Sequence, residues 1–201
     1  ALKDLRLAVE HGATHISWYQ LTIEPNTVFF RTQPVLPQDE VLEHIQELGE
    51  AYLKANGFIN YEVSAWRKEK PSAHNLNYWK FGDYLAIGAG AHGKVTRPEG
   101  IYRFQKTRLP KDYFAKVPAE HVQMKRIEAD ELPFEFMMNA LRLNDGVDAK
   151  FYTQRTGLDL QDINETLNQL RDKKLLVDDV NRIACTEQGH IFLNSVLESF
   201  L

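Results

Sequence analysis

A strand-like run, an amphipathic helix and a second strand-like run follow one another over residues 15–66. Residues 15–23 and 58–66 are rich in β-branched and aromatic side chains, which favour extended structure. Between them, Asp39 can cap a helix whose apolar residues recur at helical spacing, and Gly57 can end it. Because strands joined through a helix are parallel with a right-handed crossover, this pattern predicts a βαβ unit.

A third strand is predicted at residues 84–91, and a turn at residues 97–100 leads into a hairpin arm over residues 101–107. We expect the three strands to be the closing strands of a barrel whose earlier strands this chain lacks. A polar, poorly patterned stretch then runs to about Asp130, where we place a domain boundary.

The remaining residues predict a different arrangement. Three helices precede two short strands and a last helix, and these elements cover residues 132–143, 150–156, 160–173, 175–177, 182–185 and 188–201. Three helices followed by a β-wing form a winged-helix arrangement. The predicted fold class is therefore α/β, with the closing strands of a partial (β/α) barrel in residues 1–130 and a small winged-helix-like domain in residues 131–201.

Composition and motif content limit the possible functions. The formal net charge is −4 without a long run of like charge, so nucleic acid and anionic membranes are not expected partners. No apolar stretch approaches the roughly 20 residues that a membrane span requires. Cys185 is the only cysteine, which excludes a cysteine-held cluster within the chain and favours a reducing, cytoplasmic setting. No zinc-type histidine spacing or nucleophile elbow occurs, so we predict no catalytic or metal-binding residue.

The glycine-rich run IGAGAHG at residues 87–93 matches the spacing of a dinucleotide fingerprint. That fingerprint requires a helix to open at the last glycine, and Pro98 and Gly100 argue against a helix there. Glycine weakens a strand unless something approaches its backbone closely. The run is therefore interpreted either as a place where a ligand comes close or as glycines that allow tight strand–helix packing.

An aromatic segment, AHNLNYWKFG at residues 73–82, precedes the glycine-rich run. His74 and Tyr78 are four residues apart, so they share one face if the segment is helical. Imidazole is a natural axial ligand of haem iron, and Trp79 and Phe81 could supply apolar stacking surface. The alternative is a buried aromatic cluster in which His74 and Asn75 cap the helix.

His92 is a second candidate binding residue. Its position next to Gly93 and before Lys94 suggests that it faces a cofactor pocket or supplies another iron ligand. A hydrogen-bonded structural histidine is the alternative.

These motifs resemble those of radical S-adenosylmethionine proteins related to oxygen-independent coproporphyrinogen III oxidase, and within them the haem-chaperone branch. The matching blocks keep the family order along nearly the whole chain: WYQLTIEPNT at 18–27, YEVS at 61–64, HNLNYW at 74–79, GDYL at 82–85, IGAGAHG at 87–93 and EFMMNALRL at 135–143. The resemblance implies that HNxxYW contributes to haem binding through His74, Asn75, Tyr78 and Trp79. It also implies contacts to S-adenosylmethionine from Leu21, Asn77, Gly88, Gly90, Ala91 and His92.

Family members carry a CxxxCxxC motif upstream of the region matched here, and this chain lacks it. The first residues also show helical spacing with no capping residue before them. We therefore expect the chain to be the C-terminal half of a longer protein. The resemblance implies that the full-length protein holds a 4Fe-4S cluster and S-adenosylmethionine, with haem as a bound ligand.

The resemblance implies a haem chaperone that binds haem or another tetrapyrrole and delivers it to haem-acceptor proteins. The enzyme alternative is oxidative decarboxylation of coproporphyrinogen III in porphyrin biosynthesis, so enzymatic activity stays open. The intact HNxxYW favours the chaperone, since the corresponding segment of the true oxidase differs. A third hypothesis is a winged-helix ligand-sensing regulator, although the predicted helix over residues 160–173 carries acidic residues that would repel DNA.

Overall fold

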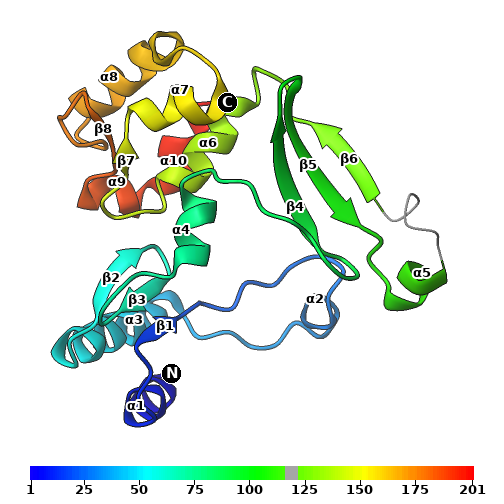
Figure 1. Cartoon of the computed structure of the whole chain (residues 1–201). Helices are drawn as coiled ribbons and strands as arrows, with labels where there is room; N and C mark the ends of the chain where they lie inside the picture. The colour runs from blue at the N-terminus through cyan, green and yellow to red at the C-terminus, as the bar shows by residue number, and fades with distance from the viewer. Residues whose placement is uncertain (116–121) are drawn as a thin grey trace. The chain divides into compact units, whose positions relative to one another are not determined.

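Three small antiparallel sheets and the helices around them make up residues 1–115 and 122–201, the part of the chain that the computed structural model describes (Figure 1). The strand orders are β1-β3-β2, β4-β5-β6 and β7-β8. The fold is therefore a mixture of α and β structure, as predicted. The chain divides into two units, Ala1–Ser72 and Ala73–Leu201, and each is described by itself.

The first unit surrounds a small apolar core. Its elements are α1 (Leu2–Glu10), β1 (His15–Ser17), α2 (Val28–Thr32), α3 (Asp39–Ala55), β2 (Ile59–Glu62) and β3 (Ala65–Arg67). α1 and α3 contact each other, and the core consists of Leu5, Ile16, Leu53, Phe58 and Trp66. The predicted helix from Asp39 is confirmed, although Gln38 occupies the N-cap position and Asp39 lies in the first turn, where a carboxylate favours the helix dipole.

The predicted βαβ unit is formed only in part: β1 and β2 run parallel, since each pairs antiparallel with β3, but β3 lies between them. Residues 58–66 do not form one strand, because a turn at residues 63–64 divides them into the β2–β3 hairpin. The Asn60 side chain stabilises this turn by donating to the carbonyls of Glu62 at 2.8 Å and Ala65 at 3.1 Å. β1 then pairs antiparallel with β3 instead of with β2. A tight turn permits this local pairing, whereas a parallel pair needs the long crossover.

Two further boundaries in this unit differ from the prediction. β1 ends at Ser17 instead of continuing to residue 23. The residues that follow contain the short helix α2, which Thr27 caps by accepting a hydrogen bond from the Phe30 amide at 3.1 Å.

The second unit begins with α4 (Ala73–Trp79) and a three-stranded sheet of β4 (His92–Arg97), β5 (Gly100–Lys106) and β6 (Val122–Arg126), with α5 (Pro110–Ala115) between β5 and β6. The predicted turn and hairpin arm are confirmed by the β4–β5 pairing. β6 was not predicted: it lies in the stretch expected to be irregular, of which residues 116–121 are outside the described part.

The predicted third strand at residues 84–91 is wrong. Tyr84 makes an isolated bridge with Lys94, and the following residues form no named strand. Gly88 and Gly90 have φ angles of 96° and 71°, in the left-handed region that an extended strand does not use. The glycines therefore make a loop that leads into β4.

Short helices dominate the rest of the second unit: α6 (Leu132–Ala140), α7 (Lys150–Thr156), the 3-10 helix η2 (Leu160–Ile163) with α8 (Asn164–Asp172), α9 (Glu187–Ile191) and α10 (Leu193–Glu198). α6 contacts α4, α7 and α10, and its Phe136 and Met137 are fully buried (Figure 1). The helix predicted for residues 188–201 is interrupted and forms α9 and α10.

The predicted wing is only partly formed. β8 (Arg182–Ile183) pairs with β7 (Val147–Asp148), and the strand predicted at residues 175–177 contributes one bridge between Leu176 and Cys185. The two units meet in the sequence between Ser72 and Ala73. The domain boundary predicted near residue 130 stays a prediction.

Gly49 provides a test of packing in the first unit. A Cβ atom at Gly49 in α3 would lie 2.0 Å from the ring of Trp18. An alanine at an open helical position would stabilise the helix by about 1 kcal/mol. Here the ring occupies that space, so we expect Gly49→Ala to lower the unfolding free energy by about 1–3 kcal/mol in urea denaturation. In a Trp18→Ala background the same substitution should be neutral or stabilising, and a stabilised single variant would contradict the packing.

Candidate functional site

α4 carries the four residues that the sequence predicts for haem binding, and a Schellman motif ends it. The amide of Phe81 donates to the carbonyl of Tyr78 at 2.9 Å, and the amide of Gly82 donates to that of Asn77 at 2.7 Å. Phe81 adopts a left-handed φ of 55°, which costs a non-glycine residue about 1–2 kcal/mol. Its ring is 2% exposed and packs edge-on against Phe136 at 5.7 Å, so burial offsets that cost.

Asn77, a predicted cofactor contact, also stabilises the loop that follows α4. Its amide nitrogen donates to the carbonyl of Asp83 at 2.8 Å. A Cβ atom at Gly82 would lie 2.1 Å from the Asn77 side-chain oxygen, so only glycine lets the amide lie here. Asn77 thus holds the loop after α4 close to the helix end.

A buried ion pair joins this loop to β4. The Lys94 ammonium is 2.8 Å from Asp83 and lies 4.3 Å above the centre of the Phe81 ring, while the Lys94 side chain is 2% exposed. Asp83 also accepts from the Thr96 amide and hydroxyl, each at 2.8 Å. Burial lowers the pKa of Lys94. Burial acts to raise the pKa of Asp83, but the hydrogen bonds from Lys94 and Thr96 outweigh it and hold that pKa below its usual range.

A second polar link runs from the aromatic cluster of α4 to α6. The Tyr78 and Tyr84 rings are 4.2 Å apart between centroids, and the Tyr84 hydroxyl accepts a hydrogen bond from Arg103 at 3.0 Å. Arg103 also donates through Nε to both carboxylate oxygens of Glu135, at 3.0 and 3.2 Å. Burial acts to lower the pKa of Arg103, but its hydrogen bond with Glu135 outweighs this and raises that pKa.

His74 is exposed at the start of α4 and meets Tyr78 edge-on, with the ring centroids 4.7 Å apart and the planes at 81°. This contact confirms that the two residues share a helix face. Within residues 1–115 and 122–201, neither imidazole nitrogen of His74 has a hydrogen-bond partner. The alternative in which the His74 side chain caps the helix is therefore not seen.

Asn75 and Trp79 are partly buried on the same helix. The Arg142 guanidinium lies over the Trp79 ring at 4.4 Å, which covers one face of the indole. The Trp79 Nε1 atom is buried and has no hydrogen-bond partner in the described part of the chain. Trp79 is thus partly covered by Arg142, while His74 is exposed at the start of the same helix.

Of the predicted cofactor residues, Gly90 and His92 line one hollow of about 580 Å³. Its polar character comes from neighbours that the sequence did not single out, among them Gln105, Arg108 and Gln123. The loop is tied to the end of β5, because the Gly90 amide donates to the Thr107 carbonyl at 2.9 Å and the Ala91 carbonyl accepts from Lys106 at 2.8 Å.

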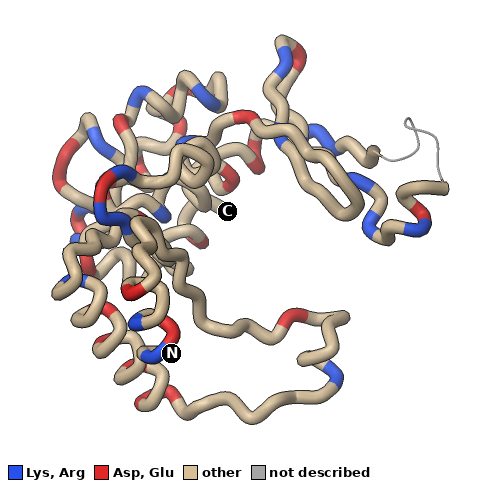
Figure 2. Tube along the Cα trace, turned by 60° about the horizontal axis from the view of Figure 1, so that its bottom comes forward, with Lys and Arg blue, Asp and Glu red and all other residues tan. Residues whose placement is uncertain are grey.

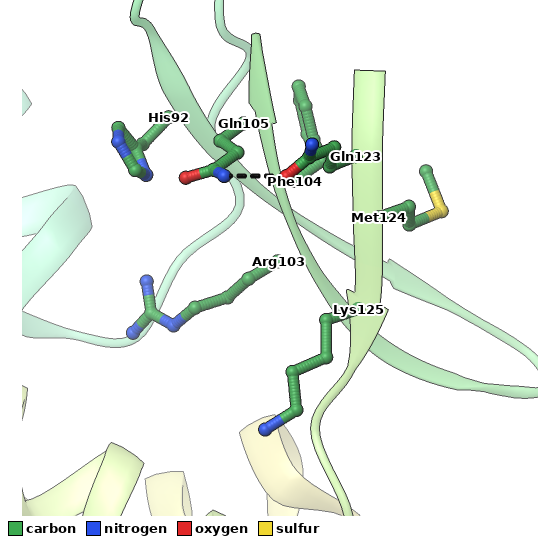
Figure 3. A pocket seen from close by; sticks show the side chains of 7 residues that line it. All are labelled: His92, Arg103, Phe104, Gln105, Gln123, Met124 and Lys125. Carbon is green, nitrogen blue, oxygen red and sulfur yellow. Dashed lines mark hydrogen bonds between the residues drawn. The ribbon is translucent and has the colours of Figure 1, made fainter. Parts of the chain in front are cut away.

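A neighbouring hollow of about 320 Å³ on the β4–β5–β6 sheet also includes His92 (Figure 3). His92, Gln105 and Arg103 extend to one side of the sheet, while Met124 extends to the other. The Gln105 amide donates to the Gln123 side-chain oxygen at 2.8 Å across the strands. His92 is exposed here and could face a ligand.

The glycines of residues 87–93 differ in their local requirements. A Cβ atom at Gly88 would meet no atom of the described residues within 4 Å, and one at Gly90 would make only ordinary contacts, so both serve the left-handed loop. Gly93 alone shows close packing, because a Cβ atom there would lie 2.2 Å from the Phe104 ring. A strand and not a helix begins at His92, so the dinucleotide-fingerprint requirement is not met.

Leu21, another residue predicted to contact the cofactor, lies in the first unit after β1 and is 47% exposed.

The residues present do not fit an iron–sulfur cluster. Cys185 is buried, and burial raises the pKa of its thiol to about 12, which disfavours the thiolate that a cluster needs. No group of three or more His, Cys, Asp or Glu residues suited to a metal ion occurs among residues 1–115 and 122–201. None of the helices in these residues is both long and apolar enough to cross a membrane.

Comparisons with known proteins relate the chain to a family of heme chaperones. Residues 127–192 match the family model described as the HemN C-terminal domain. The chain is 45% identical over 204 residues to the protein named heme chaperone HemW of Haemophilus influenzae, covering 100% of this chain and 52% of that protein. It is also 45% identical over 204 residues to heme chaperone HemW of Escherichia coli, covering 100% and 53%.

The chain is thus related along its whole length to proteins named heme chaperone HemW, and residues 127–192 match the HemN C-terminal domain. It spans about half the length of the curated relatives it matches. Among solved structures, coproporphyrinogen III oxidase HemN from Escherichia coli, a radical SAM enzyme, superposes with a TM-score of 0.70 over 98% of this chain and 50% of that one. At 15% identity, this likeness shows the fold alone.

These relatives favour the chaperone hypothesis over the oxidase and the DNA-binding regulator. Figure 2 shows Lys and Arg interspersed with Asp and Glu along the trace. α8, the helix that would have to read DNA, carries Glu165 and Asp172. These carboxylates would repel DNA phosphates at the position of a recognition helix.

The residues that fix α4 were mostly missed from the sequence. Asp83 and Lys94 lie at or beside recognised motifs, but nothing local shows that they form a pair. Arg103 and Glu135 are 32 residues apart, and their pairing depends on how β5 lies against α6. Gln123 could be placed beside the hollow only if β6 had been predicted. The sequence of β6 is mostly polar, so it was not recognised as a strand.

Asp83→Ala tests the ion pair that fixes this loop. The substitution leaves the buried Lys94 ammonium without its carboxylate, so we expect a loss of about 3 kcal/mol in unfolding free energy at neutral pH. This value is at the low end for a broken buried pair because the Asp83 side chain is 43% exposed. Thr96→Val, which removes one of the donors to Asp83, should cost about 1 kcal/mol.

The pH dependence of this loss follows from the depressed pKa of Asp83. Its stabilisation is present above the unfolded-state pKa of about 4 and is lost as the pH falls through the folded-state pKa. The difference between wild type and Asp83→Ala in urea denaturation should therefore shrink below pH 4. A difference that is small at pH 7 or grows on acidification would contradict the role of the pair.

Proposed function

We propose that this chain is the C-terminal portion of a radical S-adenosylmethionine haem chaperone, and that it binds haem through α4 for delivery to acceptor proteins. The observation that carries the proposal is His74: an exposed imidazole without a hydrogen-bond partner in the described residues, held beside Tyr78. Similarity to proteins named heme chaperone HemW along the whole chain supports it.

In this proposal His74 Nδ1 or Nε2 is the axial donor to the haem iron, since neutral imidazole is a common haem ligand. Tyr78 restricts the tilt of the imidazole through the edge-on contact at 4.7 Å. The Tyr78 and Trp79 rings, with Asn75 on the same helix, give the macrocycle a partly apolar surface. These residues bind and orient haem as cargo.

The exposure of His74 suits a carrier. A haem buried in a closed pocket dissociates slowly, because every contact must break before it leaves. A ligand on the surface of a short helix leaves one side of haem accessible to an acceptor protein. We propose that this access permits transfer.

We further propose that Leu21, Asn77, Gly88, Gly90, Ala91 and His92 contribute to S-adenosylmethionine binding in the full-length protein. The polar hollow that contains Gly90 and His92 supports this assignment. The 4Fe-4S cluster would be held by residues outside this chain, because Cys185 does not fit as a ligand.

The finer architecture also belongs to the proposal. Residues 1–130 would complete a radical-SAM barrel, and residues 131–201 would form a winged-helix-like domain that acts as a lid or docking surface without binding DNA. The free, buried thiol of Cys185 is consistent with a reducing cytoplasmic setting.

A haem titration followed by Soret absorbance tests the site. We expect saturable one-to-one binding to the chain, and His74→Ala should weaken it at least tenfold and shift the Soret band because the axial imidazole is lost. His44→Ala is the matched control, since His44 is also an exposed helical histidine, with a side chain 67% exposed. Unchanged affinity in His74→Ala would contradict the site, and a loss confined to His92→Ala would move the ligand to β4.

A further inference from the structure

We propose that Tyr84 and Arg103 are positioning residues for the haem ligand: they fix the Tyr78 ring, and this ring fixes the plane of the His74 imidazole. The inference rests on the proposed haem-binding function of α4 and adds residues outside HNxxYW to it. Glu135 on α6 anchors the chain of contacts at its far end.

The first link orients His74. Metal-binding histidines are usually held by a hydrogen bond to the ring nitrogen that does not bind the metal. His74 has no such partner within the described residues, and the ring contact to Tyr78 is its alternative restraint. The orientation of the imidazole therefore depends on how firmly the Tyr78 ring is held.

The second link holds Tyr78. Tyr84 packs against it with centroids 4.2 Å apart and planes at 51°. The backbone of Tyr84 is itself fixed to β4, because its amide donates to the Lys94 carbonyl at 2.9 Å and its carbonyl accepts from the Lys94 amide at 3.0 Å. Tyr84 is thus a rigidly placed support for the partly buried Tyr78 ring.

The third link fixes the Tyr84 ring. Its hydroxyl accepts from Arg103 Nη1 at 3.0 Å, and Arg103 Nη2 and Nε donate to Glu135. The planar guanidinium serves both partners at once, which the single ammonium of lysine cannot reproduce in the same geometry. The side chains of Arg103 and Glu135 are 34% and 21% exposed, so the surroundings partly protect this fork from water.

These contacts are separable from the core that holds α4 in place. Phe81 joins α4 to α6 through its buried ring against Phe136, independently of Tyr84 and Arg103. Loss of the Tyr84 hydroxyl would leave that core intact and would free the rings on the ligand-binding face. The consequence should therefore fall on haem binding more than on folding.

The test combines haem titration with electron paramagnetic resonance of the ferric complex, using the whole chain. We expect Tyr84→Phe and Arg103→Lys each to weaken haem binding three- to tenfold and to broaden the ferric signal, because the imidazole plane is no longer unique. Arg97→Lys is the matched control: Arg97 also lies over a tyrosine, with its guanidinium 5.6 Å from the Tyr102 ring, and pairs with a glutamate. It should leave both readouts unchanged.

A double-mutant cycle separates positioning from general stability. If Tyr84 acts through His74, Tyr84→Phe should have no further effect on haem affinity in a His74→Ala background. Equal losses in both backgrounds would overturn the inference, as would unchanged affinity and signal in Tyr84→Phe and Arg103→Lys while His74→Ala is impaired. If His74→Ala itself binds haem like wild type, the proposed function of α4 fails first. Unfolding midpoints of all variants show whether any loss comes from misfolding.

Discussion

The Lys94 ammonium lies in the interior of the second unit, 2.8 Å from Asp83 and 4.3 Å from the centre of the Phe81 ring. A charge this buried needs a close partner, and the carboxylate of Asp83 can reach it only if the loop after α4 turns sharply. The left-handed conformation of Phe81 produces that turn. The end of α4, the path of the loop and the start of the sheet are therefore set by one cluster of three side chains.

This cluster explains how a helix as short as α4 is held in place. α4 has only seven residues, which is too few for an isolated helix to be stable in water. Its Schellman end, the Phe81 core and the Tyr84–Arg103–Glu135 contacts supply the order that helix propensity cannot. The second unit thus combines a rigid support with an exposed imidazole, which is the arrangement that the proposed haem carrier requires.

Sequence patterns predicted the parts of this structure that depend on local chemistry. The amphipathic helix from Asp39, the helix Lys150–Thr156 and the β4–β5 hairpin follow from apolar spacing and turn residues. Sequence patterns did not predict which strands pair with each other. β1 pairs with β3 because a turn at residues 63–64 divides residues 58–66, which have the composition of a single strand. The glycine-rich run looked extended, yet its backbone dihedral angles are left-handed at Gly88 and Gly90. Likewise, HNxxYW located the candidate site, but its supports lie on β5 and α6, distant in sequence and joined only by the fold.

The proposed haem site depends on the His74 imidazole as the iron ligand. Nuclear magnetic resonance of the chain with ¹⁵N-labelled histidine side chains, titrated with ferric haem, observes that ligand itself. We expect the His74 ring resonances to undergo hyperfine shifts or vanish at the first equivalent, while those of exposed histidines such as His44 persist. Hyperfine effects on His92 with an unperturbed His74 signal would rule out His74 as the ligand and place the iron at the β4–β5–β6 sheet.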